Sequence, residues 1–155
     1  MRRAFLQAVI LTLASAAMGL LVNAFSPKGI PLIRPPKPQL RDQDRIPLAE
    51  AKELWDSGTA FFLDARAPAD YAAGHIALAH NLTVEQFDQY FPKTAAMLSP
   101  DSEIVVYCDG EQCDLSHLLM TLLRERGKYS HVRVLANGWT VWRKTGFPTT
   151  KGAEP

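Results

Sequence analysis

The chain has 155 residues, with 17 basic and 16 acidic side chains and a formal net charge of +1 at pH 7. This length accommodates one domain of ordinary size plus an accessory segment. The near-neutral charge excludes the strong basic field with which proteins bind nucleic acid, so we expect no nucleic-acid partner. Charge is uneven, however, because the first 40 residues contain basic side chains and no acidic one.

The N-terminal segment, residues 1–25, is predicted to be a membrane anchor. Ala4 to Phe25 contains no charged residue, and as a helix it would extend about 33 Å, enough to cross a hydrocarbon core of about 30 Å. It has no polar face, which argues against a buried helix of a soluble domain. We therefore predict a single-pass protein of the cytoplasmic (inner) membrane, inserted through residues 4–25. Arg2 and Arg3 favour an N-terminus inside and a domain outside the cytoplasm.

A cleaved signal peptide is the alternative interpretation of this segment. Arg2 and Arg3 would form its basic region and Val22-Asn23-Ala24 its cleavage site, leaving a secreted or periplasmic protein. The apolar run is longer than the core of a usual signal peptide, which favours the anchor. Basic residues downstream of the run oppose the orientation given above.

Residues 26–44 are predicted to form a spacer. Proline fixes φ and lacks an N–H, so a proline-rich stretch cannot continue a helix and favours an extended, semi-rigid chain. The prolines are Pro27, Pro31, Pro35, Pro36 and Pro38. We expect the spacer to hold a globular domain away from the membrane.

Residues 45–148 alternate between helical and extended patterns, and 149–155 are left as a tail. The first helix is predicted to begin at Pro47 and to end at Gly58. A capping box at Thr83 predicts another helix, which Pro92 should interrupt. The remaining predicted elements are strands at Ala60–Leu63, Ile104–Tyr107 and His131–Leu135, and helices at Pro68–Ala73, after Cys113 and around Trp139 and Trp142. Alternating strands and helices predict an α/β domain with a parallel sheet.

The stretch from Ile104 to Leu123 is the centre of the functional prediction. It predicts a buried strand, a loop that opens at Cys108, and a helix. Sites in parallel sheets lie at the carboxyl ends of strands, so Cys108 and the segment after Leu63 should share one edge, with the thiol exposed. The N–H groups of a helix start favour an anion, and the thiolate is the reactive form of cysteine. We therefore expect a nucleophile held over backbone donors.

Three motifs resemble the rhodanese homology domain over residues 45 to 148. They are LDARAPADYAAGHIALAHNL (63–82), IVVYCDGEQC (104–113) and VLANGWTVWRKTGFP (134–148). The resemblance implies a rhodanese-like α/β fold, with a five-stranded parallel sheet flanked by helices, preceded here by the N-terminal transmembrane helix. It also implies a sulfurtransferase: Cys108 would carry sulfane sulfur as a persulfide and pass it to a thiol or other nucleophilic acceptor.

The same resemblance assigns roles to the site residues. Cys108 is the catalytic residue, and Asp64, Arg66 and His75 are supporting residues. The active-site loop comprises Asp109, Gly110, Glu111, Gln112, Cys113 and Asp114, whose N–H groups would stabilise negative charge on sulfur. The family implies no metal and no organic cofactor. The expected partners are a small sulfur donor, or a protein persulfide or thiol.

The loop departs from the best-known members of the family by its acidic side chains. Asp109, Glu111 and Asp114 lie within six residues of Cys108, and the first basic residue after them is Arg124. Each carboxylate should cost an anionic donor on the order of 1 kcal/mol, which predicts poor use of thiosulfate. Asp114 also stands where Cys-x5-Arg phosphatases have their phosphate-binding arginine, so we expect no phosphatase activity.

Two other functions remain open. Cys113 could resolve a persulfide or sulfenic acid on Cys108, or close a disulfide with it, and the pair would then be a thiol redox centre. A rhodanese-like fold can also serve as a non-catalytic binding or sensing module.

Overall fold

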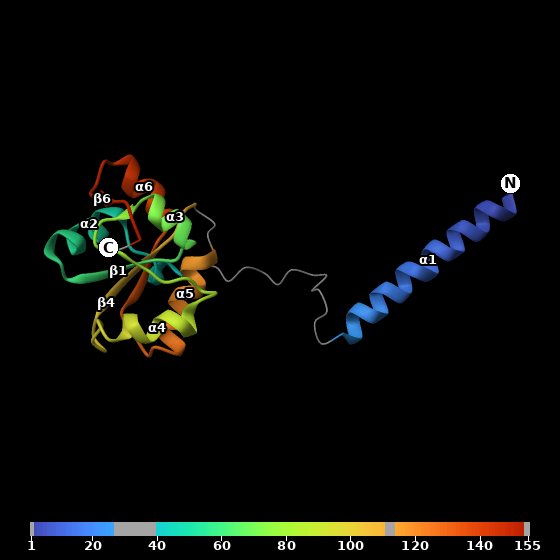
Figure 1. The fold of residues 1–155 in the computed structure, drawn as a ribbon, viewed down its shortest axis with the longest axis horizontal. Coiled ribbons are helices and arrows are strands. Elements are labelled where there is room, and N and C mark those ends of the chain that lie inside the picture. The colour runs from blue at the N-terminus through green and yellow to red at the C-terminus, as the bar shows by residue number, and fades with distance from the viewer. Residues whose placement is uncertain (1, 27–39, 111–113, 154–155) are drawn as a thin grey trace. The chain divides into compact units, whose positions relative to one another are not determined.

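The computed structural model describes residues 2–26, 40–110 and 114–153, and the chain divides into two compact units, Met1–Lys37 and Pro38–Pro155 (Figure 1). The first unit contains helix α1 (Arg2–Phe25), which is long and apolar enough over Arg2–Asn23 to be a membrane span or a signal sequence. Most of the predicted spacer lies outside the described residues. Its last part forms a short 3-10 turn, η1 (Asp42–Asp44).

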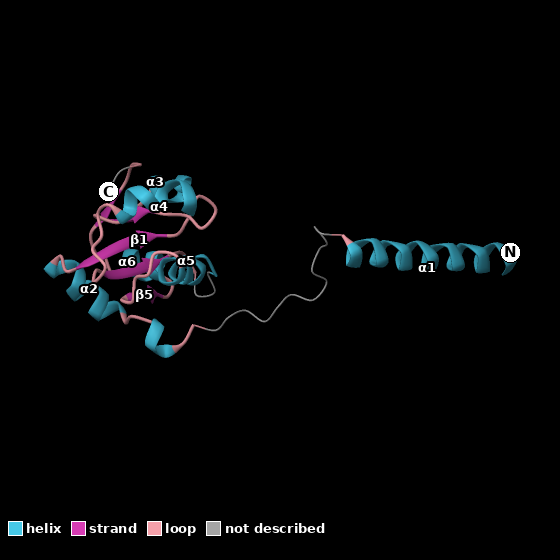
Figure 2. Ribbon diagram, turned by 90° about the horizontal axis from the view of Figure 1, so that it is seen from below, coloured by secondary structure: helices cyan, strands magenta, loops and turns pink. Residues whose placement is uncertain are grey.

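A four-stranded parallel sheet forms the centre of the second unit, in the order β3-β1-β4-β5. Figure 2 shows β1 and β5 of this sheet among the helices. Its strands are short, and the two central ones are rich in the aromatic and β-branched residues typical of a sheet covered on both faces. The strands are β1 (Ala60–Asp64), β3 (His80–Asn81), β4 (Glu103–Tyr107) and β5 (Val132–Leu135). The α/β prediction is therefore confirmed.

The main sheet has four strands where five were expected. In place of a fifth strand, Arg45 forms a single parallel bridge with Val134, and the N–H of Ile46 donates to the Val134 carbonyl at 3.0 Å. Pro47 follows immediately. Proline lacks an N–H and here precedes a helix, so the pairing ends after one bridge.

Helices cover both faces of the sheet. They are α2 (Leu48–Ser57), α3 (Pro68–Ala73), α4 (Phe87–Ala95), α5 (Asp114–Glu125) and α6 (Gly138–Lys144). A second, antiparallel pair, β2 (His75–Ile76) with β6 (Thr149–Thr150), lies beside them. The sequence did not predict this pair. Two-residue strands are too short to produce a periodic pattern.

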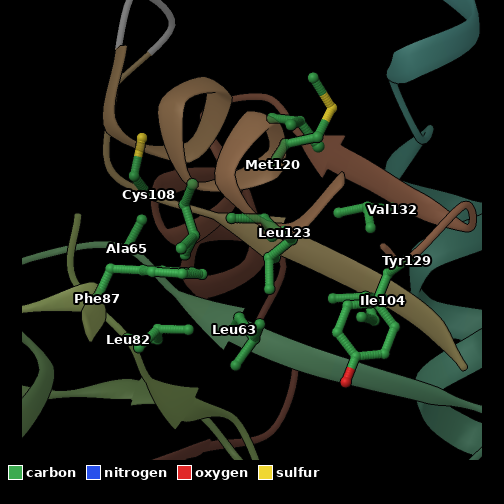
Figure 3. Close-up of a cluster of buried hydrophobic side chains, with 13 residues drawn as sticks. Leu63, Ala65, Leu82, Phe87, Ile104, Cys108, Met120, Leu123, Tyr129 and Val132 are labelled. Atoms are coloured by element: carbon green, nitrogen blue, oxygen red, sulfur yellow. The ribbon is translucent and has the colours of Figure 1, made fainter. Parts of the chain in front are cut away.

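Two buried clusters fill the space between sheet and helices. Successive strand residues point to opposite faces, so Val106 packs in a cluster with Leu119 and Leu123 of α5, whereas Val105 packs in another with Trp142 of α6. Figure 3 shows the first of these clusters. Because Val105 and Val106 are buried against different helices, α5 and α6 lie on opposite faces of β4.

Helix α4 differs from its prediction at both of the positions that were singled out. The N–H of Gln86 donates to Thr83 Oγ1 at 3.2 Å, but the helix begins only at Phe87. Pro92 lies within the helix and does not interrupt it. Its missing N–H removes the intrahelical hydrogen bond that the carbonyl of Asp88 would otherwise accept, and the helix still buries Phe87 and Thr94.

Asp44 joins the start of the domain to α5. Its buried carboxylate accepts hydrogen bonds from Arg41 Nε at 2.8 Å and from Arg124 Nη1 at 2.7 Å. Arg124 Nη2 also donates to the Val132 carbonyl at 2.6 Å. The hydrogen bond from Arg41, followed by those from Arg124 and the charges of both arginines, lowers the pKa of Asp44 despite its burial.

This ion pair predicts an acid-sensitive contribution to stability. Because the folded-state pKa of Asp44 is lowered, the contribution is complete above the unfolded value of about 3.9 and is lost as pH falls through the folded value. Asp44→Asn should therefore reduce the free energy of unfolding at pH 7 and flatten its decline below about pH 5. Urea unfolding at a series of pH values measures this. The control is Asp42→Asn, because Asp42 is an exposed residue in the same turn. If the free energy of unfolding of Asp44→Asn declined below pH 5 as steeply as that of the wild type, the assignment would be contradicted.

Candidate active site

Cys108 directly follows β4, at the carboxyl end of the main sheet. Cys108 is only 1% exposed and packs in the buried cluster that contains Leu119 and Leu123 of α5. The prediction of an exposed thiol is therefore wrong. The cause is α5, whose Ser116 Oγ lies 3.4 Å from Cys108 Sγ. Figure 3 shows the sulfur pointing away from Leu63 and Leu82, at the margin of the cluster.

The active-site loop is described at its two ends. Asp109 and Gly110 follow Cys108 and are exposed, and Asp114 begins α5. Glu111, Gln112 and Cys113 lie outside the described residues. Cys108 is in a disulfide-bonded state in this structure. Chemistry that starts from the thiolate therefore requires that this bond first be reduced.

The start of α6 holds the described part of the loop. The N–H of Trp139 donates to the Cys108 carbonyl at 3.1 Å, and Asn137 Oδ1 accepts the N–H of Gly110 at 3.1 Å. The N–H of Gly110 is therefore directed at a side chain and not at the sulfur, so this one group does not take part in the predicted cradle. Gly138 permits the approach, since a Cβ there would lie 2.6 Å from Tyr107 Cβ.

Asp64 and Arg66 form a buried ion pair at the end of β1. Arg66 Nη2 lies 2.6 Å from Asp64 Oδ2 and also donates to the Gly74 carbonyl at 2.7 Å. Burial alone would lower the pKa of Arg66, but the hydrogen bonds and charge of Asp64 outweigh it and the pKa is raised. Asn81 Nδ2 donates to both backbone carbonyls, that of Asp64 at 3.0 Å and that of Arg66 at 2.9 Å. The pair thus ties β1 to β3 and to the start of β2.

His75 packs inside the domain. It is fully buried, its ring stacks on Tyr71 with centroids 3.7 Å apart, and its Nδ1 lies 2.9 Å from the Tyr71 carbonyl oxygen. Tyr71 Oη in turn donates to the Ala79 carbonyl at 2.6 Å, and burial raises the pKa of this phenol to about 12. None of the described contacts joins His75 to Cys108. These contacts hold the ring within the domain.

A pocket of about 460 Å³ adjoins the loop, and its walls come from three parts of the chain. Asp109 and Leu115 contribute one wall, Arg66 a second, and Trp139 with Arg143 a third. The guanidinium carbons of Arg66 and Arg143 lie 4.6 and 5.6 Å from the centre of the Trp139 ring, within cation–π range.

The pocket changes the charge balance that the loop sequence suggests. Counting loop residues gives only acids, but the fold adds the guanidiniums of Arg66 and Arg143, which lie far from Cys108 in the sequence. Arg66 is paired with Asp64, and Asp70 also lines the pocket. Arg143 was missed, although it stands four residues after Trp139 and therefore on the same helix face. Among the described residues, no group of three or more His, Cys, Asp or Glu could hold a metal ion.

Comparisons with known proteins agree with this geometry. The model of the rhodanese-like domain family matches residues 47–145. The solution structure of the rhodanese-like domain of an Anabaena protein matches with a TM-score of 0.58 and 26% identity, covering 70% of this chain and 79% of that one. A thiosulfate sulfurtransferase from Pseudomonas aeruginosa matches with a TM-score of 0.56 and 25% identity, over 68% of this chain and 19% of that one.

A curated relative has a different role. A helix-turn-helix-type transcriptional regulator of Mycobacterium tuberculosis is 31% identical over 111 residues, which are 72% of this chain and 46% of the regulator. The chain thus spans about half the length of that relative.

Proposed function

Because the chain belongs to the rhodanese-like domain family, we propose that it is a sulfurtransferase that carries sulfane sulfur on Cys108. The observation that carries this proposal is the position of Cys108, which opens a loop at the carboxyl end of a central parallel strand. The next residue, Asp109, lines the pocket that a donor or acceptor would enter.

The reaction needs two displacements at sulfur. In the first, the Cys108 thiolate attacks the sulfane sulfur of the donor, a new S–S bond forms, and the donor's leaving group departs with the electron pair. In the second, an acceptor thiolate attacks the outer sulfur and Cys108 leaves as the thiolate. Cys108 is a thiolate before the first step and again after the second, so turnover requires no external oxidant or reductant once Cys108 is reduced.

Described residues near Cys108 support both steps. Ser116 Oγ, 3.4 Å from Sγ, is placed to donate to an anionic sulfur. The Trp139 N–H fixes the backbone of Cys108 through its carbonyl. A nucleophile whose backbone is held in this way loses little freedom when it reacts, which lowers the barrier.

The pocket favours donors of low net charge. Its two arginines are matched by Asp70 and Asp109, and Asp64 pairs with one of them. A dianion such as thiosulfate would therefore enter a site with no excess positive charge. We infer that a protein persulfide or a small persulfide of lower charge is a better donor, and that a thiol is the acceptor.

Arg143 should matter for anionic donors in particular. Arg143→Gln removes an exposed charge at the pocket wall, so the KM for an anionic donor should rise about two- to fivefold, with less effect at high salt. Steady-state kinetics with a neutral and an anionic donor measures this. The neighbouring Lys144→Gln, also exposed on α6, is the control, and an equal change for both donors would contradict the prediction.

The proposal is tested by the intact mass of the full-length chain, purified in detergent and reduced. After exposure to thiosulfate, mercaptopyruvate or a polysulfide, the wild type should gain one sulfur atom from at least one donor. Cys108→Ser should gain none, and Cys113→Ser should still gain it. No gain with any donor would favour the binding or sensing module.

A thiol redox centre is the second candidate function, and the disulfide-bonded state of Cys108 favours it. In the same experiment this function predicts the reversible loss of two hydrogen atoms on oxidation, in a reaction that needs both Cys108 and Cys113. A redox centre should also act without a sulfane donor. A chain that transfers sulfur only after prior reduction would combine the two properties, with the disulfide as an inactive form.

We also propose that α1 remains in the mature protein as a single-pass anchor. Its apolar side chains are exposed along its length, including Phe5, Leu11 and Leu13, and such a surface requires an apolar environment. The membrane-bound product should therefore have the mass of the full chain, and the domain should be cleaved by a protease added to spheroplasts, whose outer membrane has been opened. A shorter, soluble product would show that the segment is a cleaved signal peptide.

A further inference from the structure

Asp109 lies between two residues whose backbones are fixed by α6. On one side, the Cys108 carbonyl accepts the N–H of Trp139. On the other, the N–H of Gly110 donates to Asn137 Oδ1 at 3.1 Å. Asn137 has a left-handed backbone with φ of 53°, which asparagine tolerates better than most residues. The position of Asp109 is therefore defined, and its side chain is the part that can still turn.

Thr140 holds that side chain. In the first turn of α6, its hydroxyl donates to Asp109 Oδ1. The carboxylate is thereby bound on the α6 side of the loop, and the hydroxyl offsets part of its charge. This contact matters because Asp109 is adjacent to Cys108, and a carboxylate near a thiol opposes formation of the thiolate.

We propose that Thr140 is a positioning residue that holds the Asp109 carboxylate against α6 and so preserves the reactivity of Cys108. This inference rests on the proposed function only in taking Cys108 as the nucleophile. It also gives a reason why a chain with acids in its loop can retain a reactive cysteine. The adjacent acid is engaged by a hydroxyl of a helix that already fixes the residues on either side of it.

Other charged groups around this end of β4 act on Cys108 together with Asp109. Asp114 stands at the start of α5, Asp64 ends β1 with Arg66 just after it, and Arg143 lies on α6. All of these remain when Thr140 is changed. A substitution of Thr140 should therefore reveal the effect of Asp109 alone.

The test measures how fast iodoacetamide alkylates Cys108 as a function of pH. It uses the reduced full-length chain in detergent with Cys113→Ser in all variants, so that only Cys108 reacts. In Thr140→Val the pH midpoint should rise by about half a unit to one unit, which slows alkylation below the midpoint about three- to tenfold. Thr140→Ser should restore the original midpoint. Asn137→Gly keeps the left-handed backbone but frees Gly110, so it should shift the midpoint in the same direction by less.

A double-mutant cycle that combines Thr140→Val with Asp109→Asn identifies the cause of the shift in the pH midpoint. If Thr140 acts through the Asp109 charge, Thr140→Val should leave the midpoint unchanged once Asp109 is asparagine. Thr145→Val is the control, because the Thr145 hydroxyl donates to the Val141 and Trp142 carbonyls of α6 and, among the described residues, to no group of the loop. An unchanged midpoint in Thr140→Val, or an equal shift in the Asp109→Asn background, would overturn the proposal. Alkylation does not depend on sulfur transfer, so this result is separate from the fate of the proposed function.

Discussion

Cys108→Ser should lower the rate of sulfur transfer by at least about 10³-fold, because a serine hydroxyl is scarcely ionised near pH 7 and cannot form a persulfide. Cys108 is buried among apolar side chains and serine is close to it in size, so the fold should survive the change. The measurement is the steady-state rate with a persulfide donor and a thiol acceptor, beside the urea unfolding midpoint.

Cys113→Ser separates this result from the redox alternative. Sulfur transfer should continue in that variant, whereas a dithiol reaction would stop in both. A Cys108→Ser chain that still transfers sulfur at a tenth of the original rate or more would show that another residue is the nucleophile. If Cys108→Ser lost both its activity and its folded state, the activity would be measured in Cys108→Ala instead. Alanine is also small and adds no buried hydroxyl.

Asp64→Ala should produce the largest loss of stability among single changes outside the two hydrophobic clusters. The side chain of Asp64 is fully buried and pairs with Arg66, whose side chain is only 8% exposed. Removing one partner leaves the other as a buried charge without its counter-ion, which typically costs about 3–5 kcal/mol. We therefore expect the free energy of unfolding to fall by an amount of this size in urea titrations.

A matched surface pair provides the control. Lys52 and Asp56 form an ion pair one turn apart on α2, with the Asp56 side chain 56% exposed, so Asp56→Ala should cost less than about 0.5 kcal/mol. If the loss in Asp64→Ala comes from an unpaired buried charge, the double variant Asp64→Ala/Arg66→Met should recover part of it. A loss in Asp64→Ala no larger than that in Asp56→Ala would contradict this account of the pair.

Elements built from strong local patterns could be predicted from the sequence. The run Ile104–Tyr107 predicted β4, and α2 ends at Gly58 as predicted, with a φ of 65° at that glycine. Elements set by tertiary contacts could not. β2 and β6 are two residues each and exist because distant segments meet. The fifth strand is reduced to one bridge because Pro47 follows so closely.

The candidate site shows the same division. A cysteine directly after a buried strand predicts a residue at the sheet edge, and the structure places Cys108 there. Its burial could not be predicted, because it depends on how closely α5 lies over the strand end, with Ser116 against the sulfur. Likewise, Arg143 and Thr140 approach the loop only because α6 begins at a glycine that allows close contact with β4. Sequence spacing gives no information on such approaches.

The most direct test of a Cys108 persulfide is its competence as an intermediate. The reduced full-length chain would be loaded with a sulfur donor, freed of excess donor, and mixed with a thiol acceptor while its intact mass is followed. We predict that the added sulfur leaves Cys108 at a rate no slower than steady-state turnover, and that one acceptor persulfide appears for each loaded chain. An added sulfur that remains on the chain in the presence of acceptor, or that is also present on Cys108→Ser, would contradict the account.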